Sequence, residues 1–233
     1  MVTLLNEIQF PVLSGITMEG SLVQKLGDKS ITKDQLLEKV KHNYDLIPEL
    51  LSGISSLKPT IRYGCGKILM DLSEEKPEKL YPYMDFFINL LESKYRILTW
   101  NAIIIIANLT KIDKEHKFDS IFEKYYSFLD NEYMVTVVNV VGNSGKIALA
   151  KPHLTQRITN KLLTVENITT TPHLSEECKR VITEHAIKSF DMFFPQIEQK
   201  DRVISFVKKH LNSSRKTLRT ESENFLKKWG ESV

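Results

Sequence analysis

The chain has 233 residues, 42% of them hydrophobic and 26% charged, which is ordinary globular usage and excludes a disordered or collagen-like chain. Its 9 glycines and 8 prolines are too few for the closely spaced turns of a sandwich, a barrel or a doubly wound sheet, so long helices are expected. The net charge of +3 is too small to indicate nucleic-acid binding by itself.

The first 44 residues predict a helical cap. A helix is expected over residues 32–40, where Thr32 and Gln35 have the spacing of a capping box, and residues 22–26 are a shorter candidate. Terminal repeats of helical arrays are often irregular because one of their faces meets water. We therefore assign residues 1–44 to an N-terminal cap.

A pair of apolar-periodic segments recurs along the rest of the chain. In the second segment of each pair, apolar or small side chains recur at offsets of +3, +6, +7 and +10 from its start, which lie on one face of an α-helix. Because another such segment precedes each start, the repeating unit is a pair of helices. The spacings of 34, 38, 46 and 39 residues are typical of helical solenoids, and the starts are Arg62, Arg96, Met134, Arg180 and Arg219.

These pairs resemble HEAT repeats, in which the second helix opens with an apolar residue and an arginine after a short acidic turn. An acidic residue stands four positions before the start in three copies, at Glu92, Asp130 and Glu176, whereas the acid expected six positions before it is absent. Met134 also interrupts the arginine series. The resemblance covers residues 45–230 and implies an all-α fold, a right-handed α-solenoid of about five HEAT-like helix pairs that continues from the cap.

Two segments between the apolar patterns are irregular in composition. Residues 164–175 include three consecutive threonines and a proline, which form helices poorly and predict an extended loop. Residues 142–146, Gly-Asn-Ser-Gly-Lys, have some likeness to a phosphate-binding loop, but the Walker pattern needs Gly and Ser or Thr where the chain has Val140 and Ile147. We expect a helix that ends at glycine there.

No combination of residues predicts a catalytic, metal or cofactor site. The six histidines include no pair at metal-ligand spacing, and Cys65 is expected to be a small core residue. Cys65 and Cys178 have no C-x-x-C partner, the first residues do not resemble a signal peptide, and the longest apolar run, residues 102–107, is far shorter than the about 20 residues of a membrane helix. We expect a non-catalytic, cytoplasmic protein without metal, cofactor or membrane anchor.

The offset of +5 in each second helix points away from the core and carries a polar residue. Stacking of the repeats would align these residues along the concave face, with two aromatic side chains beside them as anchors. Amides and a neutral imidazole donate and accept hydrogen bonds, as the backbone of an extended peptide requires. This predicted partner-binding set, the concave ridge, consists of Tyr63, Lys67, Trp100, Asn101, Asn139 and His185.

Basic side chains are concentrated at the C-terminal end. Residues 200–228 contain nine basic and three acidic residues, a net charge of +6. Such a segment is suited to nucleic-acid phosphates or an acidic protein, and a solvated end face is the alternative. The candidate polyanion-binding residues are Lys208, Lys209, Arg215, Lys216, Lys227 and Lys228.

Two functions fit this architecture. Because solenoids leave two extended surfaces free, the first hypothesis is an intracellular scaffold or adaptor that binds a protein partner along its concave face. The alternative is a nucleic-acid-binding protein that uses the basic C-terminal segment and resembles, in architecture only, the alkylpurine DNA glycosylases with HEAT-like repeats. A groove for duplex DNA should be rich in Lys and Arg, and the concave ridge has one Lys and no Arg, which favours the scaffold.

Overall fold

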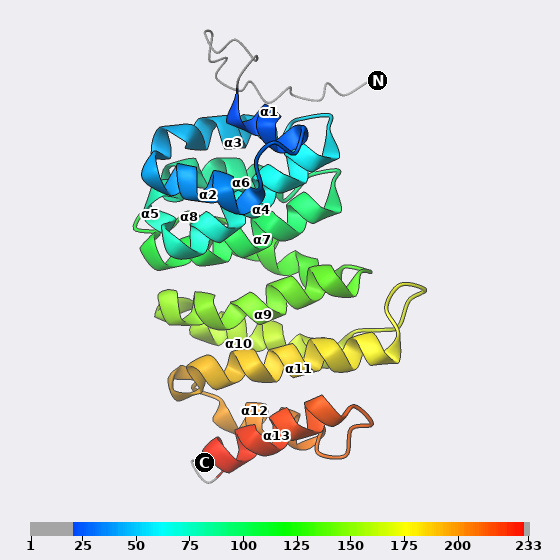
Figure 1. The fold of residues 1–233 in the computed structure, drawn as a ribbon. Coiled ribbons are helices and arrows are strands. Elements are labelled where there is room, and N and C mark those ends of the chain that lie inside the picture. The colour runs from blue at the N-terminus through cyan, green and yellow to red at the C-terminus, as the bar shows by residue number, and fades with distance from the viewer. Residues whose placement is uncertain (1–20, 231–233) are drawn as a thin grey trace, which may run out of the picture. The chain divides into compact units, whose positions relative to one another are not determined.

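Helices make up the regular structure of the chain (Figure 1). The computed structural model describes residues 21–230, and in this range the one β contact is an isolated bridge between Thr171 and Leu174. The all-α prediction is therefore confirmed. Among the same residues, no helix is both long and apolar enough to cross a membrane.

The chain folds as two compact units, Met1–Ile68 and Leu69–Val233, and the boundary between them falls inside α4 (Pro59–Glu75). Residues 1–20 of the predicted cap lie outside the described residues, and its end at residue 44 stays a prediction. The described part of the first unit consists of α1 (Leu22–Gly27), α2 (Lys33–His42), α3 (Ile47–Gly53) and the start of α4.

The predicted capping box begins α2. Thr32 Oγ1 accepts a hydrogen bond from the backbone N–H of Gln35, and Gln35 Oε1 accepts one from the N–H of Thr32. This exchange satisfies two backbone donors at the helix start, and it sets the direction in which α2 leaves the preceding turn. The helix buries Leu36 and Val40, which are four residues apart and therefore share one face.

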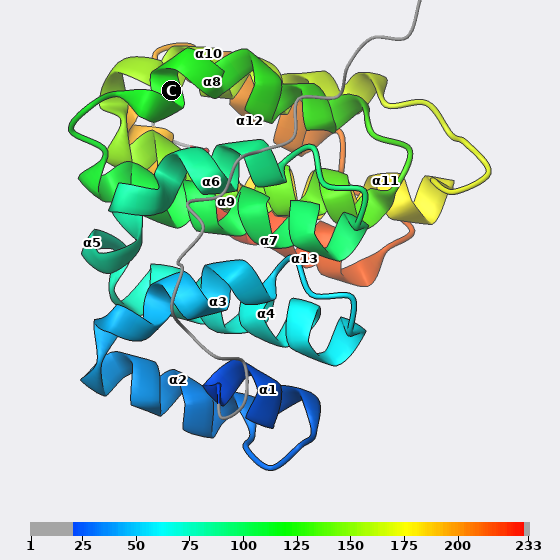
Figure 2. The ribbon, with the colours of Figure 1, turned by 90° about the horizontal axis from the view of Figure 1, so that it is seen from above.

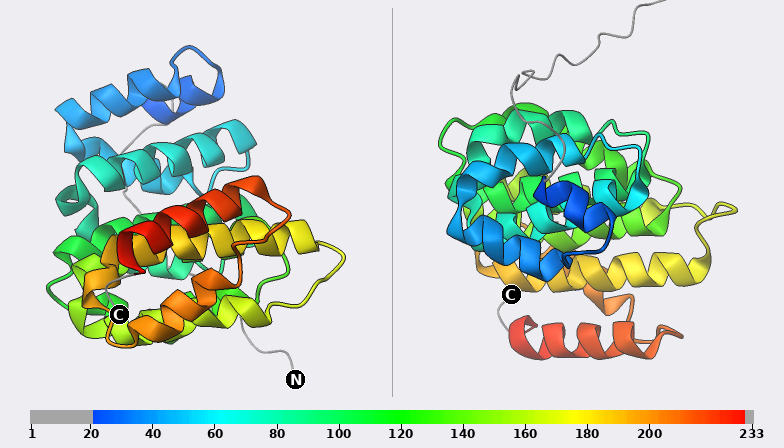
Figure 3. Two further views of the ribbon diagram at one scale, coloured as in Figure 1. Left: turned by 90° about the horizontal axis from the view of Figure 1, so that it is seen from below. Right: turned by 45° about the horizontal axis from the view of Figure 1, so that its top comes forward.

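The second unit consists of successive helix pairs arranged in two layers. Within this unit Figure 1 shows the second helices one below another, and Figures 2 and 3 show the first helices as a separate layer beside them. The short helix α5 (Pro77–Leu80) precedes the first of these pairs. The first helices are α6 (Met84–Leu90), α8 (Lys117–Tyr126), α10 (Thr155–Leu163) and α12 (Lys200–Lys208); the second helices are α7 (Arg96–Leu109), α9 (Met134–Ala150), α11 (Glu176–Phe193) and α13 (Lys216–Trp229).

The core of this unit lies between the two layers. Aromatic side chains of α8 pack against the second helices, and Tyr125 and Tyr126 are buried although each carries a hydroxyl. Tyr125 Oη donates a hydrogen bond to the carbonyl of Ile103, 3.2 Å away, and Tyr126 Oη donates one to Ser144 Oγ, 3.1 Å away. The hydroxyls are thus satisfied, and each ring contributes about 2 kcal/mol of apolar burial.

The turn before the second helices fixes the register of the repeats. In four copies a side-chain oxygen in this turn accepts a hydrogen bond from the backbone N–H of the residue two positions later. The second helix begins at the residue after that N–H. The accepting residues are Ser56, Ser93, Asn131 and Ser213. By this criterion Arg62 corresponds to Thr99 rather than to Arg96. Both donate to a carbonyl six residues earlier, since Arg62 Nη1 bonds Ser56 O at 2.8 Å and Thr99 Oγ1 bonds Ser93 O at 3.4 Å.

The sequence alignment of Arg62 with Arg96 is therefore wrong by three residues. Three residues are nearly one helical turn, so the same apolar face appears in either register and the pattern does not reveal the shift. Arg219 Nη1 donates to the carbonyl of Ser213, as Arg62 does to Ser56, and this confirms that the first and last copies are aligned correctly.

The expectation that a helix ends near Gly142 is wrong, because α9 continues through Gly142 and Gly145 without a break. A Cβ at Gly145 would lie 2.6 Å from Met192 Sδ and 3.1 Å from the carbonyl oxygen of Ser189, both on α11. The glycines therefore allow the two helices to approach closely. The predicted loop is confirmed for residues 168–175, whereas Thr164–Asn167 forms a 3-10 turn.

Candidate binding surface

The helices α7 and α9 present equivalent residues at equivalent positions. Asn101 follows the first residue of α7 by five positions, and Asn139 follows the first residue of α9 by five positions. The two helices are joined at this level by Trp100, whose Nε1 donates a hydrogen bond to Thr136 Oγ1 at 2.9 Å. Asn101 and Asn139 therefore belong to one face of the second unit.

The two asparagine amides have unused hydrogen-bonding capacity. Among residues 21–230, no protein group bonds to either side-chain amide, although the carbonyl of Asn139 accepts from Asn143 Nδ2 at 2.7 Å. Asn139 is half-buried, and Asn101 is 8% exposed, which is more occluded than the sequence predicts for an outward position. An amide without a protein partner keeps its capacity to bond solvent or a ligand, and Asn139 is the more accessible of the two.

Two apolar side chains stand at matching places on the same helices. Ile97 is the second residue of α7 and Val135 the second residue of α9, and each is 40% exposed. The preceding turn adds an aromatic group, since the Arg96 guanidinium lies 3.5 Å from the centroid of the Tyr133 ring. The sequence alignment, in which the Arg96 and Met134 copies are shifted by three residues relative to the Arg62 copy, missed Ile97 and Val135. The sequence feature that could have revealed them is an apolar residue one position after the helix start in two successive repeats.

The predicted ridge residues His185, Tyr63 and Lys67 do not occupy the position that Asn101 and Asn139 share on their helices. His185 lies nine positions after the start of α11, half-buried, and a Cβ on Gly142 would lie 3.3 Å from its Nδ1. Burial lowers the pKa of His185, with a further contribution from Lys188, so its imidazole is held neutral. Tyr63 and Lys67 belong to the first unit, where the Arg62 guanidinium lies 4.8 Å from the Tyr63 ring centroid.

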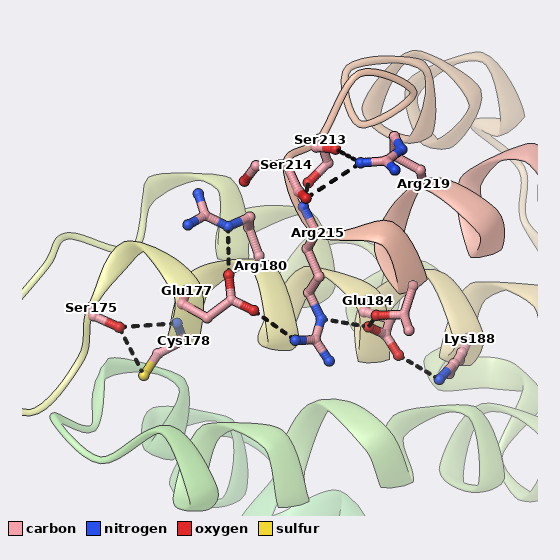
Figure 4. A network of polar contacts seen from close by, with 11 residues as sticks. Ser175, Glu177, Cys178, Arg180, Glu184, Lys188, Ser213, Ser214, Arg215 and Arg219 are labelled. Atoms are coloured by element: carbon pink, nitrogen blue, oxygen red, sulfur yellow. Dashed lines mark hydrogen bonds and ion pairs between the residues drawn. The ribbon is translucent and has the colours of Figure 1, made fainter.

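Half of the candidate polyanion-binding residues form ion pairs with acids from outside the basic segment. Arg215 Nη1 bonds Glu177 at 2.6 Å and Arg215 Nε bonds Glu184 at 2.8 Å, and Figure 4 shows the guanidinium between these two carboxylates. Lys209 pairs with Glu166, and Lys228 pairs with Asp191. No acidic partner is found among the described residues for the exposed Lys208, Lys216 and Lys227.

The local charge at this end is therefore much smaller than the net charge of the segment suggests, and the polyanion site stays a prediction. Glu184 is the most strongly held of these acids, with a side chain that is 8% exposed. Burial alone would raise its pKa, but hydrogen bonds from Lys188, Thr217 and Arg215 outweigh burial and lower the pKa to about 2.

A buried ion pair lies at the start of α8. Lys151 Nζ is 2.9 Å from Asp113 Oδ2, and the two side chains are 4% and 0% exposed. Asp113 also accepts hydrogen bonds from the backbone N–H groups of Lys117 and Phe118 and from the hydroxyl of Tyr81. Burial would raise the pKa of Asp113, but these hydrogen bonds and Lys151 lower it, so the pair is charged.

The isolated cysteine of the first unit has no chemical activation. Cys65 is fully buried against Gly53, and burial raises the pKa of its thiol to about 12. A thiol held protonated is a poor nucleophile and a poor metal ligand. The sequence interpretation of Cys65 as a core residue therefore fits its surroundings.

Comparison with known proteins shows the fold. No protein-family model matches the chain, and no curated protein matches it. Among solved structures it is similar to the designed armadillo repeat protein YIII(Dq)4CqI, at 15% identity and a TM-score of 0.50, over 88% of this chain and 90% of that chain. It is also similar to the designed armadillo repeat protein YIII(Dq.V1)4CPAF in complex with peptide (KR)4, at 15% identity and a TM-score of 0.54 over the same shares.

Proposed function

We propose that this HEAT/armadillo-like α-solenoid is a non-catalytic binding protein that holds an extended segment of a protein partner on the face formed by α7 and α9. The observation that carries the proposal is the pair of amides, Asn101 and Asn139, which occupy equivalent positions and have no protein partner among the described residues. A carboxamide both donates and accepts hydrogen bonds. It therefore matches the alternating N–H and C=O groups of an extended peptide, which need partners when they leave water.

The composition of this face indicates the chemistry of the segment. The helices α7 and α9 contain one charged residue each, Arg96 and Lys146, and no carboxylate. A basic peptide such as the (KR)4 bound by the designed armadillo protein would find no acidic partner on these helices. The exposed Ile97 and Val135 instead favour apolar side chains, each worth about 1 kcal/mol or more when buried. The segment we expect is neutral and apolar, and its backbone is held by the amides.

Peptides selected on the intact chain from a random display library test this function. We expect the selected peptides to be neutral and apolar, and we expect Asn101→Ala combined with Asn139→Ala to weaken binding about tenfold or more, since two hydrogen bonds of about 1 kcal/mol each are lost. The measurement is the Kd from isothermal titration calorimetry.

The matched control is Asn224→Ala, which removes an exposed amide from α13. We expect this variant to bind like the unchanged chain. The free energy of unfolding of the double variant should change by about 1 kcal/mol or less, because neither amide bonds to any of residues 21–230. Equal loss of binding in the control, or no loss in the double variant, would refute the assignment of the surface.

A further inference from the structure

The second unit brings together three potential metal ligands from two neighbouring repeats. His116 immediately precedes α8, Asp119 lies in its first turn, and His153 lies in the 3-10 turn Pro152–Leu154 that precedes α10. The imidazole nitrogens and the carboxylate oxygen that they offer all lie within 4.8 Å of one another. The sequence expectation of no metal site rested on short motif spacings, and ligands from successive repeats escape such a search.

The contacts among these side chains show that they point toward one another. His153 Nε2 contacts Asp119 Oδ1, and His116 Nδ1 lies 3.6 Å from Asp119 Oδ2. The centroids of the two imidazole rings are 5.7 Å apart. The histidine side chains are 65% and 49% exposed, so an ion can reach the site from solvent.

The Asp119 carboxylate also contacts the buried ion pair of Lys151 and Asp113. Lys151 Nζ lies 3.4 Å from Asp119 Oδ2 and is itself neutralised by Asp113. Asp119 Oδ2 is buried, has no hydrogen bond and lies on the side of His116, whereas Asp119 Oδ1 contacts His153. Such outer contacts orient a ligating carboxylate and are a usual feature of metal sites.

The backbone at His116 is held in an uncommon conformation. Its φ of 56° is in the left-handed region, where a residue other than glycine is disfavoured by about 1 kcal/mol. In this conformation His116 Nδ1 lies 3.6 Å from Asp119 Oδ2. A local cost of this kind occurs often at functional sites, where the surrounding structure enforces it.

We propose that His116, Asp119 and His153 form a site for a divalent transition metal of the zinc type. Two imidazole nitrogens and one carboxylate oxygen are ligands that zinc accepts, and three protein ligands leave a fourth position for water or a partner group. Zinc bonds of about 2.0–2.1 Å place tetrahedral ligand atoms about 3.3 Å apart. The most widely separated ligand atoms must therefore close by up to about 1.5 Å, and His153 Nε2 must move slightly away from Asp119 Oδ1, which the exposed histidine side chains permit.

The bound ion would join two repeats. Asp119 and His116 belong to the repeat of α8 and α9, whereas His153 belongs to the repeat of α10 and α11. An ion that bridges them adds a contact present only in the folded chain, and it stabilises that state as its concentration rises above its Kd. The site thus clamps the junction between these two helix pairs.

Titration of the intact, chelator-treated chain with Co²⁺ at pH 7.5 tests the proposal. We expect one equivalent to bind with a Kd in the micromolar range and with the visible absorption of a low-coordinate site, and we expect Zn²⁺ to displace it. The variants His153→Ala and Asp119→Asn should each weaken binding at least tenfold, while circular dichroism shows that they remain folded.

The matched control is His173→Ala, which removes an exposed histidine whose ring stacks on Tyr133 4.9 Å away. This variant should bind Co²⁺ like the unchanged chain. Absence of saturable binding, or equal binding by the His153→Ala variant, would overturn the proposal. In that case the three side chains form a surface ion pair and nothing more. Peptide binding to α7 and α9 uses other residues, so neither outcome decides the proposed function.

Discussion

Replacing Lys151 with methionine is expected to lower the free energy of unfolding by about 3–5 kcal/mol, the usual effect of leaving one partner of a buried ion pair unpaired. The Asp113 carboxylate is fully buried and relies on Lys151 Nζ at 2.9 Å for its countercharge. The measurement is urea unfolding followed by circular dichroism, with a chelator present so that a bound metal makes no contribution.

Two further variants separate the loss of charge pairing from a general loss of packing. Lys146→Met removes a lysine that is 40% exposed and pairs with Glu74, and this change should cost about 1 kcal/mol or less. Adding Asp113→Asn to Lys151→Met should restore part of the lost stability, because the unpaired buried charge is then absent. A Lys151→Met variant as stable as the unchanged chain would contradict the role of this pair.

Acid should remove the stability that Glu184 contributes between α11 and α13. The pKa of Glu184 is lowered from 4.5 to about 2 in the folded chain, so the unfolded chain binds the proton more tightly. The contribution is therefore complete above about pH 4.5 and disappears as pH falls toward 2. A shift of this size corresponds to about 3 kcal/mol, and we expect about 2 kcal/mol because solvent screens the partners in part.

The comparison of Glu184→Gln with the unchanged chain between pH 7 and pH 3 measures this effect. The difference in unfolding free energy should be largest at pH 7 and should shrink by more than half at pH 3. Glu92→Gln serves as the control, because Glu92 pairs with Lys124 but has a side chain that is 73% exposed. A difference for Glu184→Gln that does not change with pH would show that the carboxylate charge is not what joins the helices.

Helix formation and helix pairing could be predicted from the sequence, and the register of the repeats could not. Apolar periodicity reports which face of a helix is buried, and it is nearly unchanged by a shift of three residues. The register is set instead by short polar side chains such as Ser56 and Ser93, which bond a backbone N–H two residues later. These bonds leave almost no pattern in a single sequence, because serine is common in turns of every kind.

The same limit applies to the concave ridge, whose role in binding stays a prediction. Asn101 and Asn139 were aligned correctly with each other, because the shift affects both copies equally. His185 was not, since the start of α11 follows a longer loop. A net charge counted along the chain also overstates the local charge at the basic end, because Arg215 pairs with Glu177 and Glu184 from another helix. Contacts between repeats decide both features.

Photocrosslinking of a selected peptide tests most directly the claim that the face of α7 and α9 is the binding surface. A photoreactive phenylalanine analogue is placed at Val135, which is 40% exposed on α9, or at the exposed Ser120 on α8 in the other helix layer. We expect the bound peptide to be captured from position 135 and not from position 120, with capture lost when Asn101 and Asn139 are both alanine. Capture from position 120 alone would contradict the account.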